Sequence, residues 1–254
     1  MNITPSFLAP TTYPSLDSNP GSLNTSQNDT PALNRKKRGV ASRYELWPQN
    51  ATIKISLIGM TEEQKKFTKK NICKWAPHIN LKIQFTERSD GDIRIKADNT
   101  IIGGHSAIGR NSAAGTGASM VIGFRDGNNA DASGTILHEF GHALGLEHEH
   151  QHPNATLDFN LESIYQRAIK SDPTLTRDDV HYNVVEKLHH ASVITSPYDA
   201  ESIMHYKFSS EELNGGNAVP ERNELSKEDI RFMSKLYPKG YCVPARHSGF
   251  GYYS

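Results

Sequence analysis

The sequence predicts an α+β fold, with a β-sheet and two long helices in its first part and a less regular second part that ends in a helix. Three observations predict it. Short stretches of alternating polarity, typical of strands, are frequent before residue 125. Two helical patterns with start or stop signals lie among and after them. Beyond residue 145 regular patterns become sparse, and a last capping signal precedes residue 227.

The order of the expected elements is strand, helix, three strands, and then four helices. The ordered part is expected to begin near Tyr44, and the helix of residues 135–144 to be preceded by Ser133 as its cap. The expected strands are residues 51–57, 81–85, 93–95 and 119–124. The expected helices are residues 62–75, 135–144, 161–169, 177–188 and 227–236.

Composition excludes several classes of function. Lys+Arg and Asp+Glu both number 28, so the net charge is zero and no basic surplus points to nucleic acid. No apolar run is long enough to span a bilayer, so we expect no membrane span. The first ten residues lack the pattern of a signal peptide. We nevertheless expect a protein that is secreted, or delivered outside the producing cell by another route.

The sequence predicts two parts, a leader and one folded domain. Residues 1–38 are rich in Ser, Thr, Asn and Pro without a hydrophobic period, which is typical of a disordered leader or propeptide-like segment. They end in a basic run, residues 35–38, which is either a solvated charge cluster or a site where an activating protease cuts near Arg38. Residues 39–254 are expected to form the catalytic domain.

Histidines and one glutamate carry the strongest chemical signal. Nine of the twelve histidines lie between His138 and His205. Residues four apart in a helix share a face, so His138 and His142 can bind one metal ion together. Glu139 would lie beside the ion, where it can take a proton from water and pass it to a leaving amine. We expect one Zn²⁺ per chain as the cofactor.

Gly145 and His148 complete this motif. Gly145 can end the helix abruptly through a positive φ, and that turn directs His148 toward the other two histidines. Three imidazoles then hold the zinc ion and leave one position open for water, as a catalytic site requires. A structural zinc site would close all four positions, which this motif does not do.

A second short motif, Ser202 to Tyr206, lies downstream. Metzincin enzymes place a tight turn with a methionine beneath their zinc ligands, and Met204 would be that methionine. The chain resembles the astacin-type metzincin metallopeptidases in two segments, His138 to His150 and Ser202 to Tyr206. The resemblance covers roughly residues 44–242.

The resemblance implies a zinc-dependent endopeptidase with the metzincin fold. In that fold a twisted mixed sheet lies above a cleft, and the active-site helix lies along the cleft. Tyr206 would be a further zinc ligand that moves away when substrate binds and then donates a hydrogen bond to the oxyanion. The substrate would be a protein or peptide bound in extended form, paired antiparallel with an edge strand. We expect residues 119–124 to be that edge strand.

Three further positions take a role from the resemblance. Glu149, directly after the third histidine, would receive the new amino terminus of a chain cut after Arg38, which is Gly39. The family's domain end makes a disulfide between Cys73 and Cys242 a second expectation, with two reduced, buried cysteines as the alternative. The sequence before residue 39 lacks the Asp-containing inhibitory motif that propeptides of this family carry.

Several other polar residues are expected to have minor roles. His150 and His152 would lie behind the ligands or at the surface, and His205 would pack near the methionine turn. Some astacins favour acidic residues after the cut through a basic pocket, for which Arg222 or Lys207 could supply the charge. Surface charge is the interpretation that we favour for both.

A different class of function is a catalytically silent, zinc-containing module that only binds peptides. Proteins that lose catalysis usually lose the glutamate beside the first ligand, and Glu139 is present. A peptidase of another metzincin branch is a nearer alternative, and Tyr206 after the methionine favours the astacin type. The sequence does not identify the natural substrate.

Overall fold

The computed structural model describes residues 39–240. The predicted leader, residues 1–38, and Cys242 of the predicted disulfide lie outside the described residues. The strands are β1 (Gly39–Ser42), β2 (Thr52–Ile58), β3 (Lys82–Thr86), β4 (Ile93–Asp98), β5 (Gly104–Ser106), β6 (Met120–Gly123) and β7 (Val193–Ser196). The α-helices are α1 (Glu62–Ile72), α2 (Ala130–Ala143), α3 (Leu161–Ser171), α4 (Arg177–Val180) and α5 (Lys227–Leu236).

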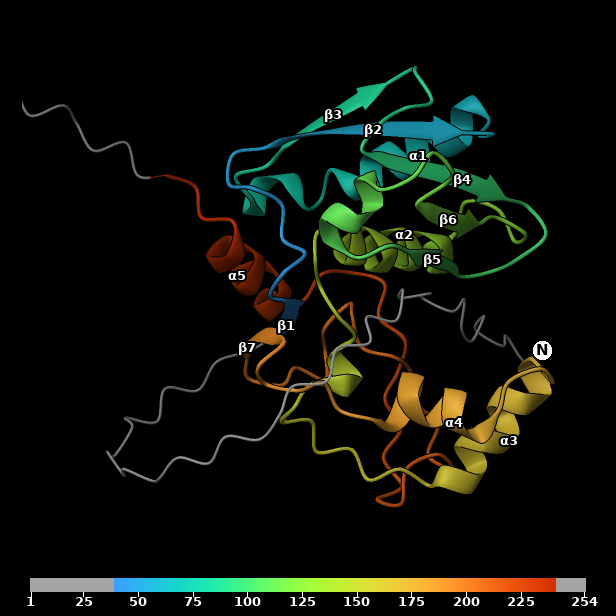
Figure 1. Cartoon of the computed structure of the whole chain (residues 1–254). Helices are drawn as coiled ribbons and strands as arrows, with labels where there is room; N and C mark the ends of the chain where they lie inside the picture. The colour runs from blue at the N-terminus through green and yellow to red at the C-terminus, as the bar shows by residue number, and fades with distance from the viewer. Residues whose placement is uncertain (1–38, 241–254) are drawn as a thin grey trace, which may run out of the picture.

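A five-stranded mixed sheet forms the upper part of the molecule (Figure 1). Its strand order is β3-β2-β4-β6-β5, in which β5 alone runs antiparallel to its neighbour. Ile53 and Ile55 of β2 and Ile93 and Ile95 of β4 are fully buried, as expected for central strands that are covered by helices. The predicted mixed sheet is therefore confirmed.

The edge of the sheet differs from the expectation. Residues 119–124 contain an inner strand, β6, and the edge strand is β5. Three residues that begin with a glycine carry no alternating pattern, so β5 could not be recognised from periodicity. Because β5 covers β6, a peptide that extends this end of the sheet must pair with β5, while β3 forms the opposite edge.

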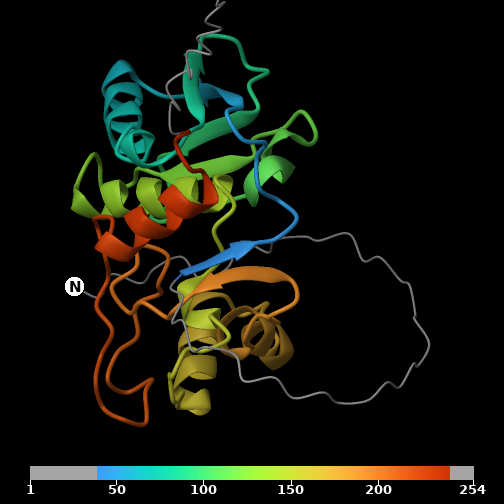
Figure 2. The same ribbon diagram turned by 90° about the vertical axis from the view of Figure 1, so that its left-hand side faces the viewer.

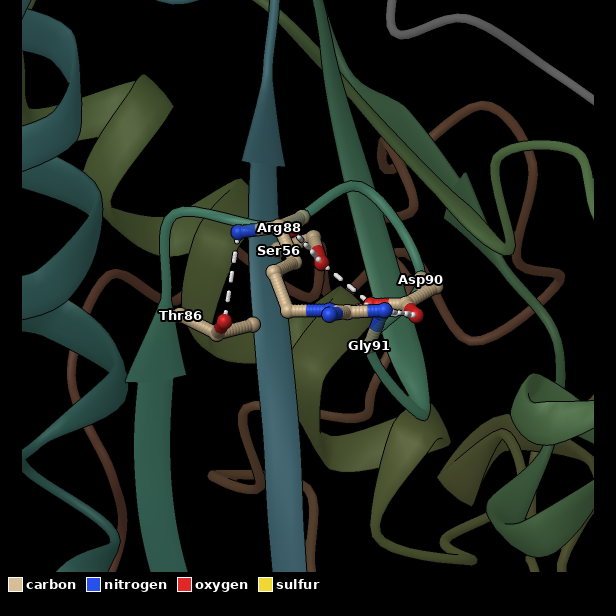
Figure 3. Close-up of polar contacts among 5 residues, drawn as sticks. All are labelled: Ser56, Thr86, Arg88, Asp90 and Gly91. Carbon is tan, nitrogen blue, oxygen red and sulfur yellow. Dashed lines mark hydrogen bonds and ion pairs between the residues drawn. The ribbon is translucent and has the colours of Figure 1, made fainter.

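The connection between β3 and β4 crosses over β2 (Figure 3). The crossing point is Ser56, whose Oγ donates to the Arg88 carbonyl at 2.5 Å and accepts from the Gly91 amide at 2.9 Å. A Cβ at position 91 would lie 2.8 Å from the Lys54 carbonyl oxygen, so the close approach requires glycine. A salt bridge between Arg88 and Asp90 closes the loop at 2.6 Å.

Helices α1 and α2 pack against each other, with α1 behind the strands of the sheet and α2 beside β5 and β6 in the view of Figure 1, and Figure 2 shows both from the side. Thr61 and Gln64 form the predicted capping box at the start of α1. Helix α2 begins earlier than predicted, because Asn129 caps it through a hydrogen bond from the Ala132 amide. Ser133 instead donates to the Asn71 side chain at 2.6 Å. No helix among residues 39–240 is long and apolar enough to cross a membrane.

The described chain starts before Tyr44, the expected beginning of order. Strand β1 pairs antiparallel with β7, about 150 residues later in the chain. Helix α5 lies beside β1 (Figure 1), where Phe232 packs against Gly39 so closely that a Cβ there would lie 2.5 Å from its ring. This pairing could not be read from local pattern, since each strand has four residues and its partner is distant.

The C-terminal half has a small core of its own. Ile164, Ala168, Val180 and Val184 are fully buried in it, which fits α3 and α4 packing through their apolar faces. The helix predicted over residues 177–188 is shorter than expected. It ends as α4 at Val180 and continues as one π-helical stretch, His181–Val185.

Cys73 caps the end of α1 and is exposed. The alternative of two buried cysteines is therefore wrong for Cys73.

Tyr237, at the end of α5, links the C-terminal helix to the end of α2 by hydrogen bonds. Its hydroxyl donates to the Leu144 carbonyl at 2.7 Å and accepts from the Trp47 amide at 3.1 Å. Trp47 in turn donates through its indole to the Ala143 carbonyl at 2.8 Å. The last carbonyls of a helix need such partners when they are buried.

We expect Tyr237→Phe to destabilise the protein by about 1–3 kcal/mol, because it leaves the Leu144 carbonyl and the Trp47 amide buried without a partner. Urea unfolding followed by circular dichroism measures this change. Tyr44→Phe is the matched control, since Tyr44 is 64% exposed and should change stability by less than about 0.5 kcal/mol. Equal midpoints for both variants would contradict the assigned role of Tyr237.

Candidate metal centre and active site

Three histidines meet at the C-terminal end of α2. One ligand nitrogen from each of His138, His142 and His148 lies within 4.8 Å of the others, and no second such cluster occurs among residues 39–240. The Nε2 atoms of His142 and His148 are 3.0 Å apart. That separation is close to the roughly 3.3 Å between two ligands bound to one zinc ion in tetrahedral geometry. Three imidazoles fit a catalytic zinc ion, which keeps a position open for water.

Backbone carbonyls orient two of these rings. The Nδ1 atom of His138 lies 2.7 Å from the Ile203 carbonyl oxygen, and that of His142 lies 2.7 Å from the Leu146 carbonyl oxygen. Each Nδ1–H can therefore donate to a carbonyl, which leaves Nε2 with the lone pair that a metal needs. Burial lowers the pKa of His138 and His148, and it lowers the pKa of His142 to about 3.

Gly145 turns the chain between the second and third histidines. It adopts the positive φ that the sequence predicts, at 101°, and a Cβ there would lie 2.7 Å from the Leu46 side chain. The following residues lie beside β1, because the Ser42 amide donates to the Gly145 carbonyl at 2.9 Å. The turn therefore depends on the segment directly after residue 38 as well as on the helix.

Met204 packs under the helix that carries the first two histidines. It is buried, and a Cβ at Gly141 would collide with its sulfur. Close contact with the methionine thus explains a glycine in the middle of α2, where it would otherwise weaken the helix. The sequence did not reveal this role of Gly141, because its contact partner lies more than sixty residues away.

Asp229 of α5 holds the methionine turn in place. One carboxylate oxygen accepts from the Ser202 hydroxyl at 2.6 Å, and the other accepts from the Ile203 amide at 2.9 Å and the Ser226 amide at 2.8 Å. Since the Ile203 carbonyl orients His138, one peptide segment joins Asp229 to the histidine cluster. From the sequence, Asp229 could be placed only in the first turn of the last predicted helix, residues 227–236.

Glu139 is buried beside the histidines, and its side chain lines the cleft. Burial raises its pKa to about 8. A bound dication nearby would favour the ionised form and oppose this rise. A carboxyl group whose pKa lies near neutrality can both accept and return a proton.

Tyr206 stands next to the cluster, packed between two histidines. Its ring centroid is 4.4 Å from that of His148 and 4.2 Å from that of His150, and its side chain lines the cleft. Burial raises the pKa of its phenol, so the group can act as a hydrogen-bond donor. His150 lies behind Tyr206, as the sequence predicts, and it is not part of the metal cluster.

The remaining predicted polar residues lie around the methionine turn. Glu149 is buried, and its Oε1 accepts from the Asp199 amide at 2.8 Å. Burial raises the pKa of Glu149 well above its usual value. His205 lies 2.7 Å from the Tyr198 hydroxyl, and His152 lies 2.6 Å from the Ser196 carbonyl oxygen. Both histidines are buried, so neither is a surface residue.

Two pockets flank the histidines along the cleft. The first is lined by Gly103, Thr135, Ile203, Lys207, Glu221 and Arg222, together with His138, Glu139 and Tyr206. Lys207 and Arg222 are thus half-buried at the cleft, and our interpretation of them as plain surface charges is wrong. Lys207 is neutralised by Glu221, with 2.7 Å between Nζ and Oε2.

The second pocket lies on the other side of the histidines. It is lined by His105, Ser106, Glu147, Tyr182, Glu186 and Lys187, together with Glu139, His142, His148 and Tyr206. Burial, together with the charge of Glu45, raises the pKa of Glu147 to about 8. The sequence analysis missed Glu147 as a cleft residue, although it lies inside the histidine motif.

Comparison with known proteins decides the family. Residues 39–238 match the model of the peptidase family described as Astacin. The chain belongs to the astacin family. Tolloid-like protein 1 of Mus musculus is 29% identical over 230 residues, which are 82% of this chain and 20% of that protein. Zinc metalloproteinase nas-39 of Caenorhabditis elegans is 30% identical over 129 residues, which are 46% of this chain and 13% of that protein.

Solved structures agree with this assignment. A structure of myroilysin superimposes with a TM-score of 0.75 at 28% identity, covering 80% of this chain and 100% of that one. A hatching enzyme, High choriolytic enzyme 1 of Oryzias latipes, has a TM-score of 0.52 at 21% identity, covering 76% of this chain and 94% of that one, and so supports the fold alone. The predicted metzincin fold is confirmed.

The chain spans about a fifth of the length of the Tolloid-like relatives that it matches. The family that residues 39–238 match is described as a peptidase family, which is the enzyme class that the sequence predicts.

We expect Asp229→Asn to weaken zinc binding by about tenfold, because an amide cannot accept all three hydrogen bonds and the Ile203 peptide then holds His138 less firmly. Competition with a chromophoric zinc chelator measures the affinity. Asp178→Asn is the matched control, since Asp178 is exposed at the start of α4. An unchanged affinity in Asp229→Asn would show that the turn does not need this carboxylate.

Proposed function

We propose that this astacin-family protein is a zinc-dependent endopeptidase that binds one zinc ion through His138, His142 and His148. The observation that carries the proposal is the convergence of three imidazoles beside the buried Glu139 in an open cleft. When bound, zinc would polarise the scissile carbonyl and lower the pKa of a water molecule.

Glu139 and Tyr206 have distinct roles in the proposed reaction. Glu139 takes the proton of the attacking water and later delivers it to the leaving amine. The Tyr206 hydroxyl would hold the zinc ion as a further ligand in the absence of substrate, and it would donate a hydrogen bond to the oxyanion when substrate is bound. The position of Tyr206 supports this role, because its ring lies against the expected ligand His148, with 4.4 Å between the two ring centroids.

The substrate is a protein or peptide in extended form, paired with the edge strand β5. Its backbone would bond to groups of β5 that face away from β6. Antiparallel pairing fixes the direction of the substrate. Its residues before the scissile bond then lie at the Ser106 end of β5, and those after it lie at the Gly103 end.

We expect Glu139→Gln to bind zinc normally and to lower kcat for casein cleavage by a factor of about 100–10,000, because the amide cannot take the proton. Metal content and cleavage are measured on the same samples. Glu63→Gln, an exposed change on α1, serves as the control. A zinc-loaded wild type that cuts no more than Glu139→Gln would favour the alternative function, a silent module that only binds peptides.

An activating protease that cuts after Arg38 belongs to the same proposal. The Gly39 amide donates to the Pro197 carbonyl at 2.9 Å, and two residues further on the Asp199 amide donates to Glu149. An ammonium group formed at Gly39 would arise next to this loop, where the buried Glu149 needs positive charge.

We expect limited trypsin treatment to yield a form that begins at Gly39, with several times the activity of the intact chain. Intact mass identifies the form, and casein cleavage compares the two. Glu149→Gln should remove most of the gain, because the new ammonium then lacks its carboxylate. Equal activity before and after the cut would contradict the maturation step.

We also propose that this peptidase is delivered outside the cell that produces it. Detection of the protein in culture medium, with a cytosolic enzyme as the marker for lysis, tests it.

A further inference from the structure

The second pocket of the cleft holds two carboxyl groups that the proposed reaction does not use, those of Glu147 and Glu186. We call it the upstream pocket, because antiparallel pairing with β5 places it beside substrate residues before the scissile bond. It shares His142, His148 and Tyr206 with the catalytic centre, so a substrate side chain in it lies close to the reacting bond.

Glu147 lines this pocket with an uncompensated carboxyl group. Its amide donates to the Val40 carbonyl at 3.1 Å, yet no hydrogen bond or ion pair of the side chain occurs within residues 39–240. The charge of another carboxylate, Glu45, acts on it and raises its pKa further. That residue already faces Arg110, with 3.8 Å between Oε2 and Nε.

The other charged groups of the upstream pocket do not neutralise Glu147. Glu186 adds a second, exposed carboxylate without an ion pair in the described part of the chain. The ammonium of Lys187 donates to the Ala155 carbonyl at 2.6 Å, which draws it toward that carbonyl. Tyr182 lies at the pocket with 60% of its surface exposed, and a phenol ring attracts a cation that lies over its face.

We propose that the upstream pocket binds a basic side chain, lysine or arginine, of the substrate, with Glu147 as its counter-ion. A long aliphatic stem can lie along Tyr182 while its charged end reaches a carboxylate. Glu186 strengthens the attraction from the rim.

The two ends of the cleft therefore select different side chains. The first pocket holds Arg222 beside the neutralised pair of Lys207 and Glu221, so its charge is positive or balanced. The upstream pocket holds two carboxyl groups besides that of Glu139, namely Glu147 and Glu186. This inference rests on the proposed function for the direction of the substrate, while the charge preference of the pocket can be tested without turnover.

The binding test uses the zinc-loaded Glu139→Gln variant and two labelled, unstructured peptides. One carries three consecutive lysines, and the other carries three N-acetyl-lysines of the same length without charge. We expect the lysine peptide to bind about five to ten times more tightly, as a partly buried ion pair allows. Adding Glu147→Gln should bring the ratio of affinities close to one, whereas adding the exposed Glu63→Gln should leave it unchanged.

Cleavage supplies the second readout. Wild type is incubated with a library of peptides from a denatured proteome, and the new ends are identified by mass spectrometry. We expect lysine and arginine to be enriched among the three residues before the cut, and the enrichment to be lost in Glu147→Gln but not in Glu63→Gln.

The outcomes separate the two proposals. Equal affinity for both peptides, a ratio that Glu147→Gln does not change, or basic residues enriched only after the cut would overturn the inference about the upstream pocket. A wild type that cuts nothing but still prefers the lysine peptide through Glu147 would overturn the proposed peptidase and keep the pocket.

Discussion

Bringing three neutral imidazoles to one point is the constraint on which the rest of this structure depends. Helix periodicity supplies two of them, His138 and His142, without any special backbone geometry. The third, His148, requires the chain to leave the helix within two residues, which only the positive φ of Gly145 permits without strain. The burial that lowers the pKa of these rings also keeps them unprotonated, so a metal does not have to displace protons at neutral pH.

The two halves of the molecule are joined through the same cluster. Asp229 of the last helix bonds to the Ile203 amide, and the carbonyl of that residue orients His138 of the central helix. Met204, the next residue, packs against Gly141 on the same helix. A disturbance of the C-terminal helix therefore reaches the metal ligands through two bonds and one packing contact, although α5 itself stays outside the cleft.

Much of the site could be predicted because its information is local. The spacing from His138 to His148 lies within one helix and one turn, and the short methionine motif needed only a resemblance to be recognised. The strand pair β1 and β7 could not be predicted in this way, since its register depends on residues far apart. Asp229 looked like an ordinary cap, and β5 was too short to show a period. Asp229 orients His138 through Ile203, and β5 is the edge at which we propose that the substrate binds.

The turn at Gly145 has a second consequence, for the residue between it and the third histidine. Leu146 pairs with Ala41 of β1 in extended conformation and is buried in the core. Successive side chains of an extended segment point to opposite sides, so Glu147 must face away from that core, toward the cleft. The backbone geometry that delivers His148 to the metal site thus also fixes Glu147 in the substrate's path. An apolar side chain at this position would make the pocket favour apolar side chains of the substrate. A carboxyl group makes the same position favour basic ones.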